Sequence, residues 1–155
     1  MKSLLVRSIA CCAVPLPLAT QAKTYGGFKP GDTFNLKLDY RTSIKEVGSV
    51  VTDKQPIPAG IPKFKVGATV KFTIGKKGQL TAKGLSMPFK EVDAVIHPGD
   101  VIYLAPPKNG YPFGDTGRLA KSAAGKPVSL GLDFAKTEIT GGVTTTYHVY
   151  YSFVK

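Results

Sequence analysis

The sequence predicts an all-β protein: a single antiparallel β-sandwich or small β-barrel of about seven to nine short strands, following a cleaved signal peptide. Three observations predict this fold. Several segments alternate polar and apolar residues, many of the 17 glycines and 12 prolines lie between those segments, and only one segment has helical spacing. We expect residues 1–22 to be the signal peptide and residues 23–155 to form a single basic β-rich domain.

Residues 1–22 have the pattern of an export signal. Lys2 and Arg7 precede an uncharged, mostly apolar segment, Ser8–Leu18, and Ala22 supplies a small residue at the cleavage position. The apolar segment contains two prolines and is shorter than the roughly 20 apolar residues that a membrane-spanning helix needs. We therefore expect export to the periplasm or the extracellular space, with no transmembrane helix in the mature chain.

Both cysteines, Cys11 and Cys12, lie within this predicted signal peptide. Cleavage leaves a mature chain without cysteine, so no disulfide can stabilise the exported domain. A chain of this length buries enough of its surface for an apolar core to hold the fold without covalent links.

Alternation with a period of two marks the clearest strands. Thr33–Tyr40 places Phe34, Leu36, Leu38 and Tyr40 on one predicted core-facing side. Ala68–Ile74 and Val128–Ala135 alternate in the same way, and Val143–Val154 is rich in the Thr, Val, Tyr and Phe residues that suit a pleated sheet. Weaker strands are predicted at Ile44–Thr52, as the return of the first hairpin, and at Glu91–Ile96 and Val101–Leu104.

Turns and connectors complete the predicted order. Gly75–Gly78 is a hairpin turn that leads into a strand beginning at Leu80. Gln55–Pro62 contains three prolines and is expected to run extended without ladder hydrogen bonds. Thr116–Ala124 is compatible with a short helix or with a strand; we favour the strand, because it gives Val128–Phe134 a local partner.

The sequence assigns no catalytic residue, metal site or cofactor. His97 and His148 are the only histidines and are far apart in the chain, so a zinc site is not expected. Glu91 and Asp93 share one predicted strand face, where they could act as acid and base or as calcium ligands. A hydrolase of unknown substrate is therefore the least favoured alternative, with this pair or His148 as its candidate groups.

Positive charge is the most unusual feature of the composition. The chain has a formal net charge of +11, and the segment from Lys54 to Lys90 holds eight lysines and no acidic residue. Such a cluster attracts anionic surfaces, although lysines also keep sheets soluble and protect their edges. The candidate anion-binding residues are Lys63, Lys65, Lys71, Lys76, Lys77 and Lys83.

The segment Pro106–Gly117 is a second candidate site, because long loops often carry function. Asn109, Tyr111 and Phe113 are its candidate ligand- or partner-binding residues, since amphipathic rings offer a contact surface for a sugar, peptide or protein. The alternative is that the rings of Tyr111 and Phe113 fold back and close one end of the barrel.

These features predict an exported, non-enzymatic β-domain that binds an anionic envelope component or a protein partner. Acidic polysaccharide, lipopolysaccharide or another anionic envelope surface would suit the lysines. Nucleic acid is not an expected ligand, because specific phosphate sites favour arginine over lysine and because export removes the protein from the cell interior. A small outer-membrane β-barrel is the main alternative.

Overall fold

The structure is a computed structural model that describes residues 23–91, 99–106 and 114–155. The predicted signal peptide, residues 92–98 and residues 107–113 lie outside the described residues. Within the described part of the chain there are ten strands and no helix, which confirms the all-β prediction.

The strands follow one another along the chain with short turns and one long connector. They are β1 (Thr33–Val47), β2 (Val50–Thr52), β3 (Thr69–Ile74), β4 (Leu80–Ala82), β5 (Leu85–Met87), β6 (Phe89–Lys90), β7 (Val101–Leu104), β8 (Thr116–Lys121), β9 (Pro127–Thr140) and β10 (Val143–Val154). All the pairings between them are antiparallel.

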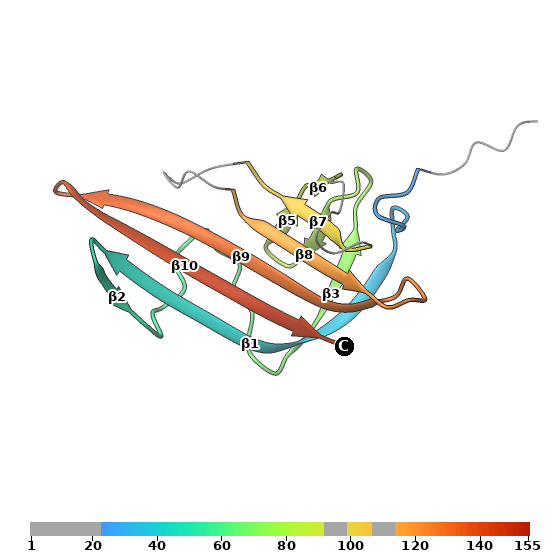
Figure 1. The fold of residues 1–155 in the computed structure, drawn as a ribbon, viewed down its shortest axis with the longest axis horizontal. Coiled ribbons are helices and arrows are strands. Elements are labelled where there is room, and N and C mark those ends of the chain that lie inside the picture. The colour runs from blue at the N-terminus through green and yellow to red at the C-terminus, as the bar shows by residue number, and fades with distance from the viewer. Residues whose placement is uncertain (1–22, 92–98, 107–113) are drawn as a thin grey trace, which may run out of the picture.

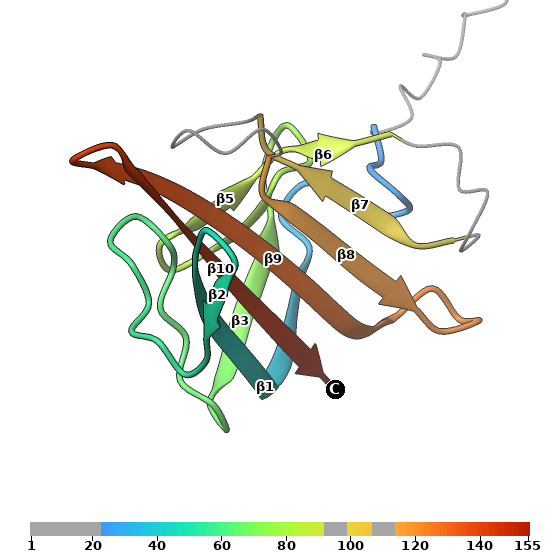
Figure 2. The same ribbon diagram turned by 60° about the vertical axis from the view of Figure 1, so that its left-hand side comes forward.

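The sheet curls into a nearly closed barrel (Figures 1 and 2). Its order is β5-β4-β3-β1-β10-β9-β8-β7-β6, with β2 paired to β1 outside this path. The two ends of the order, β5 and β6, are adjacent in the chain and are separated only by Pro88. The backbone N–H of Leu104 in β7 donates a 3.0 Å hydrogen bond to the Pro88 carbonyl, which continues the β7 pairing to this junction. Closing a sheet in this way removes most of its exposed edges.

Apolar side chains fill the interior of the barrel. The largest fully buried side chains include Leu36, Leu38, Phe72, Ile74, Leu80, Met87, Tyr103, Leu119, Leu130, Leu132, Tyr151 and Phe153. The rings of Phe72 and Phe153 meet edge to face at 5.1 Å between centroids. Burying a side chain of this size contributes roughly 1.5–3 kcal/mol before entropy is counted, so this interior can stabilise the fold without disulfides.

Two predictions about the first strands are wrong. Residues Ile44–Val47 belong to β1, and the return strand is confined to Val50–Thr52, because β10 pairs with β1 all the way to Val47. Tyr40 is 52% exposed and does not face the core. A register shift between Leu38 and Tyr40 reverses the alternation, so Arg41 lies opposite the buried Tyr151.

Other predicted elements are confirmed. Thr116–Lys121 is strand β8, which forms the favoured hairpin with β9, and the turn at Gly75–Gly78 joins β3 to β4. Asp53–Ala68 runs without strand pairing between β2 and β3, and includes the predicted proline-rich connector.

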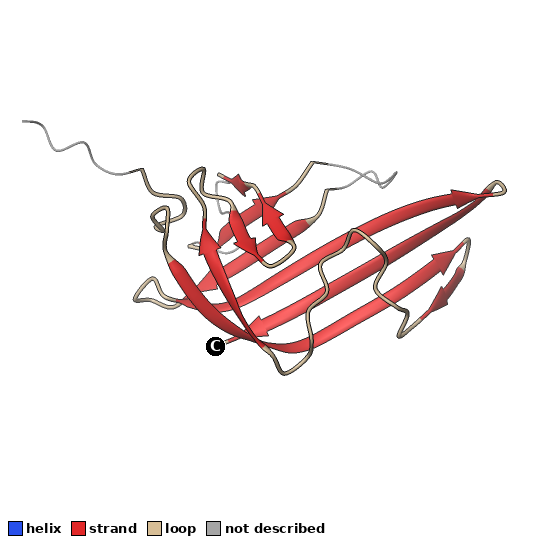
Figure 3. Cartoon of the chain, turned by 180° about the vertical axis from the view of Figure 1, so that it is seen from behind, coloured by secondary structure: helices blue, strands red, loops and turns tan. Residues whose placement is uncertain are grey.

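Strands β1, β9 and β10 extend beyond the shorter strands, to the left in Figure 1. The connector from β2 crosses this extended sheet on its way back to β3, as Figure 3 shows from behind. Contacts with the sheet hold it near both of its ends. The Gln55 N–H donates to the Ser43 carbonyl at 2.9 Å, and the Phe64 ring packs against those of Tyr151 and Phe153.

Candidate anion-binding groove

An open groove of about 740 Å³ lies between the end of the connector and the β3–β4 hairpin. Residues 60–65 of the connector line one side, and residues 69–71 of β3 with the β4–β5 turn line the other. The lining residues are Gly60, Ile61, Pro62, Lys63, Phe64, Lys65, Thr69, Val70, Lys71, Lys83 and Gly84. None of them is acidic.

Four of the six lysines predicted to bind anions line this groove: Lys63, Lys65, Lys71 and Lys83. All four are exposed. The groove therefore brings together cationic side chains from three segments that are separated in the sequence. The sequence alone did not predict which of the clustered lysines lie together in the described part of the structure.

Buried Phe64 positions the two connector lysines. Its ring lies edge to face with Tyr151 at 5.2 Å and with Phe153 at 5.4 Å. Because successive side chains of an extended segment point to opposite sides, anchoring Phe64 inward turns Lys63 and Lys65 outward.

The β3–β4 hairpin positions the other two lysines. Thr73 pairs with Thr81 and Ile74 pairs with Leu80, so the same register brings Lys71 to the level of Lys83 just beyond the end of β4. Phe72 points into the core between Lys71 and Thr73. Lys71 is thereby fixed on the outer face of the barrel.

The floor of the groove is apolar. Ile61 is 7% exposed and Phe64 is 8% exposed, and Val70 packs against the same hydrophobic cluster. A cationic rim over an apolar floor suits a ligand that carries an anionic group beside an apolar portion.

Lys76 and Lys77 do not line the groove. They lie in the β3–β4 turn, at the opposite end of β3 from Thr69 and Lys71. The Tyr25 hydroxyl donates to the Lys76 carbonyl at 3.3 Å, and the Lys77 N–H donates to Gln79 Oε1 at 2.9 Å. The six candidate lysines thus form one group of four and a separate pair.

The loop candidates Asn109, Tyr111 and Phe113 lie outside the described residues. The described residues on either side of them are paired. The Ala105 N–H donates to the Asp115 carbonyl at 2.9 Å. This bond fixes the base of the loop between β7 and β8, on strands that do not line the lysine groove.

The candidate catalytic groups are not brought together among the described residues. Asp93 and His97 lie outside them, and Glu91 is exposed next to β6. His148 lies on the outer face of β10, where its Nε2 atom is 3.9 Å from Glu46 Oε2. The described residues contain no group of three or more side chains suited to hold a metal ion. They also include no helical membrane span.

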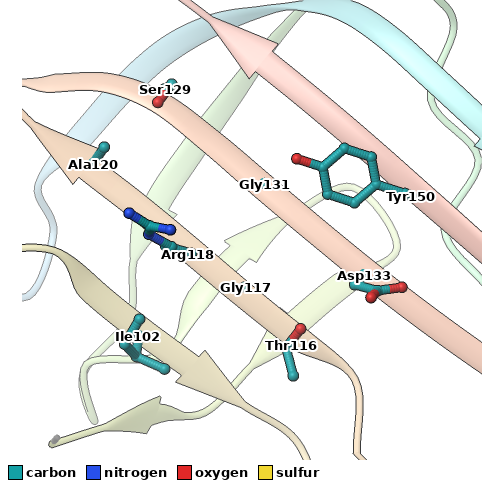
Figure 4. Close-up of a pocket in the computed structure, with 9 residues that line it drawn as sticks. All are labelled: Ile102, Thr116, Gly117, Arg118, Ala120, Ser129, Gly131, Asp133 and Tyr150. Atoms are coloured by element: carbon teal, nitrogen blue, oxygen red, sulfur yellow. The ribbon is translucent and has the colours of Figure 1, made fainter. Parts of the chain in front are cut away.

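A second depression, of about 610 Å³, lies on the outer face of β7 to β10 (Figure 4). Arg118 of β8, Asp133 of β9 and Tyr150 of β10 project into it above Gly131 and Ala120. We did not predict this depression from the sequence, because its residues come together only when four strands pair side by side. The glycine within a strand at Gly131 was the available signal.

The fold and groove define a class: a small, filled antiparallel β-barrel with a lysine-rimmed groove beside its proline-rich connector. Comparison of the chain with protein-family models, with curated proteins and with solved structures finds no match in any of the three. The functional argument therefore rests on the residues and geometry of this chain.

Proposed function

We propose that the protein is an exported, non-enzymatic binding module whose groove takes an anionic component of the cell envelope. One observation carries the proposal: Lys63, Lys65, Lys71 and Lys83 surround a single groove that has no acidic lining residue. Export, which the proposal requires, rests on the signal pattern of residues 1–22.

The energetics favour binding to an extended or multivalent anion. A lysine near an anionic lipid surface contributes about 1 kcal/mol, so four lysines acting together give a useful affinity where one gives none. Lysine is a flexible point charge and does not impose the planar geometry of arginine. We therefore expect tolerant binding that weakens steeply with salt.

The apolar floor narrows the chemical class of the ligand. Pro62 and Val70 are partly exposed and offer an apolar surface beside the lysines. An envelope lipid, with phosphate groups beside acyl chains, matches both parts of the groove. An acidic polysaccharide matches only the rim.

The outer-membrane barrel is the alternative, and the barrel-like fold is compatible with it. Membrane barrels carry an apolar outer band and a polar interior. Here the interior is apolar, whereas outward-facing Asn35, Lys37 and Lys71 are exposed and polar. This distribution supports a domain whose outer surface meets water.

The test is co-sedimentation of the purified exported protein with phosphatidylglycerol vesicles and with phosphatidylcholine vesicles at low salt. We expect binding to the anionic vesicles only, with release by moderate salt. Full recovery of the protein in the supernatant with phosphatidylglycerol vesicles would contradict the proposal.

Two variants distinguish binding in the groove from a general effect of net charge. The groove variant replaces Lys63, Lys65, Lys71 and Lys83 with Gln. The control variant replaces four exposed lysines elsewhere, namely Lys29, Lys90, Lys126 and Lys155, with Gln and therefore removes the same charge. We expect the groove variant to lose vesicle binding and the control to retain most of it. Equal losses would show that the groove is not the site.

A further inference from the structure

The depression on the outer face of β7 to β10 has a floor made partly of backbone. Gly131 has no side chain, and its partner on β8, Arg118, lines the same depression as Tyr150. A Cβ atom at Gly131 would lie only 3.0 Å from the Tyr150 Oη atom. The tyrosine ring thus extends over the glycine, and the missing Cβ allows the ring to lie against the sheet with its other side toward the depression.

Tyr150 is an exposed aromatic ring on a rigid support. It is 39% exposed, while its chain neighbours Val149 and Tyr151 are fully buried in the barrel core. A ring with two rotatable bonds, held on a central strand, loses little entropy when it contacts a ligand. Its apolar face and its hydroxyl suit a ligand that is itself amphipathic.

Charged and polar groups lie beside this ring on the outer face of the sheet. Tyr150 is opposite Asp133, and Asp133 is opposite Thr116 on the next strand. Arg118, two residues further along β8, projects from the same face. A carboxylate accepts hydrogen bonds, a guanidinium donates them, and a sugar hydroxyl needs one partner of each kind.

Arg118 is held in place by a partner outside the depression. Its Nε atom donates to Asp100 Oδ2 at 2.5 Å. This ion pair uses the Nε–H and leaves the terminal nitrogens of the guanidinium for a ligand. The side chain therefore presents its donors from a defined direction.

We infer that this depression, formed by Tyr150, Asp133 and Arg118, with the Tyr150 ring lying over Gly131, binds a neutral saccharide. The Tyr150 ring stacks on the apolar face of a sugar ring, and Asp133 and Arg118 hydrogen-bond its hydroxyl groups. Arg118 is already paired with Asp100, so the depression has no excess of positive charge and favours a neutral ligand over the anion that suits the lysine groove.

The saccharide site and the lysine groove are separate. In the sheet order, β3, which lines the groove, is separated from β9 by β1 and β10. No residue lines both depressions. A protein with both sites could contact an envelope lipid and a glycan at the same time.

The test is a titration of the isotope-labelled exported protein, followed by NMR, with maltohexaose, cellohexaose and chitohexaose in separate experiments. We expect at least one of the three sugars to shift the backbone amide signals of Gly131 and Gly117. Absence of these shifts with all three sugars at millimolar concentration would overturn the inference.

Two tyrosine variants test where the sugar binds. Tyr150→Ala should weaken the affinity about tenfold, the order of loss for truncating an aromatic anchor. Tyr40→Ala is the matched control, because Tyr40 is also an outward-facing tyrosine and is 52% exposed. The groove variant should bind sugar as the wild type does. An equal loss in the Tyr40 and Tyr150 variants would contradict the assigned site.

Discussion

The Tyr151 hydroxyl donates a 2.5 Å hydrogen bond to the carbonyl oxygen of Pro62, 89 residues earlier in the chain. This bond joins the C-terminal part of β10 to the connector immediately before Lys63. The Phe64 ring packs against the same tyrosine, at 5.2 Å between centroids. One buried residue therefore links the barrel core to the side of the groove that carries Lys63 and Lys65.

Removing this hydroxyl should destabilise the protein. Tyr151→Phe keeps the buried ring but deprives the Pro62 carbonyl of its partner, so we expect a loss of about 1 kcal/mol in the free energy of unfolding. The connector lysines should also become less well positioned, and binding to anionic vesicles should weaken. Urea denaturation and vesicle co-sedimentation measure the two effects.

Tyr103→Phe should have the opposite effect on stability. The Tyr103 hydroxyl is buried and has no hydrogen-bond partner among the described residues. Burial also raises the pKa of this hydroxyl. Deleting an unsatisfied buried group should leave the free energy of unfolding unchanged or increase it by up to about 1 kcal/mol. A loss as large as that of Tyr151→Phe would show that the Tyr103 hydroxyl has a stabilising partner.

Gly78 should be more sensitive to substitution than Gly125, a turn glycine of similar backbone conformation. It has a φ of +78°, and an added Cβ would lie within 2.2 Å of the Tyr25 ring. Gly125 has a similar φ of +74° but no atom near the added Cβ. Each alanine substitution should lower the free energy of unfolding by about 1–2 kcal/mol, because alanine is strained in this left-handed backbone conformation. Overcrowding at Gly78 should add about 1–3 kcal/mol more.

Thermal unfolding of Gly78→Ala and Gly125→Ala distinguishes the cost of overcrowding from the backbone cost that both variants share. The difference between the variants reports on the packing of Tyr25 against the β3–β4 turn. Equal losses of stability would mean that Tyr25 does not occupy this position in solution.

Asp133 should make the stability depend on pH. Burial raises the pKa of its carboxyl above the ordinary value of 3.8, an effect that His148 opposes and Asp115 increases. The folded state therefore holds the proton more tightly than the unfolded state. This contribution to stability is complete below the ordinary pKa and is lost as the pH rises through the raised pKa.

Asp133→Asn cannot ionise, so it should unfold at a higher temperature than the wild type at neutral pH. The difference should shrink as the pH falls below the ordinary pKa of an aspartate. Asp53→Asn, at an exposed position, is the control for the change in net charge. A stabilisation by Asp133→Asn that is the same at acid and neutral pH would contradict the assigned cause.

Local patterns predicted the strands whose alternation is undisturbed. Val70, Phe72 and Ile74 of β3, with the glycine turn that follows, identified one hairpin without any knowledge of its neighbours. The length of β1 could not be predicted in this way, because the pairing that extends it to Val47 is with β10, about 100 residues later. The bulge that turns Tyr40 outward depends on the same distant partner.

The candidate sites also depend on contacts between segments that are distant in the chain. The lysine surplus was visible in the sequence, but the path of the connector, which brings Lys63 and Lys65 beside Lys71 and Lys83, was not. The depression at Tyr150 was not predicted, because Arg118 and Asp133 have no informative spacing in the chain. Their proximity depends on the registers of β8, β9 and β10.

The central claim, that four lysines of one groove bind an anionic envelope lipid, is tested most directly by the salt dependence of vesicle binding. The measurement is the slope of the logarithm of the binding constant to phosphatidylglycerol vesicles against the logarithm of salt concentration. By analogy with other polyanions, each engaged lysine contributes on the order of one to this slope. We expect a much shallower slope for the groove variant and an almost unchanged slope for the control variant. The same slope for both variants would contradict the central claim.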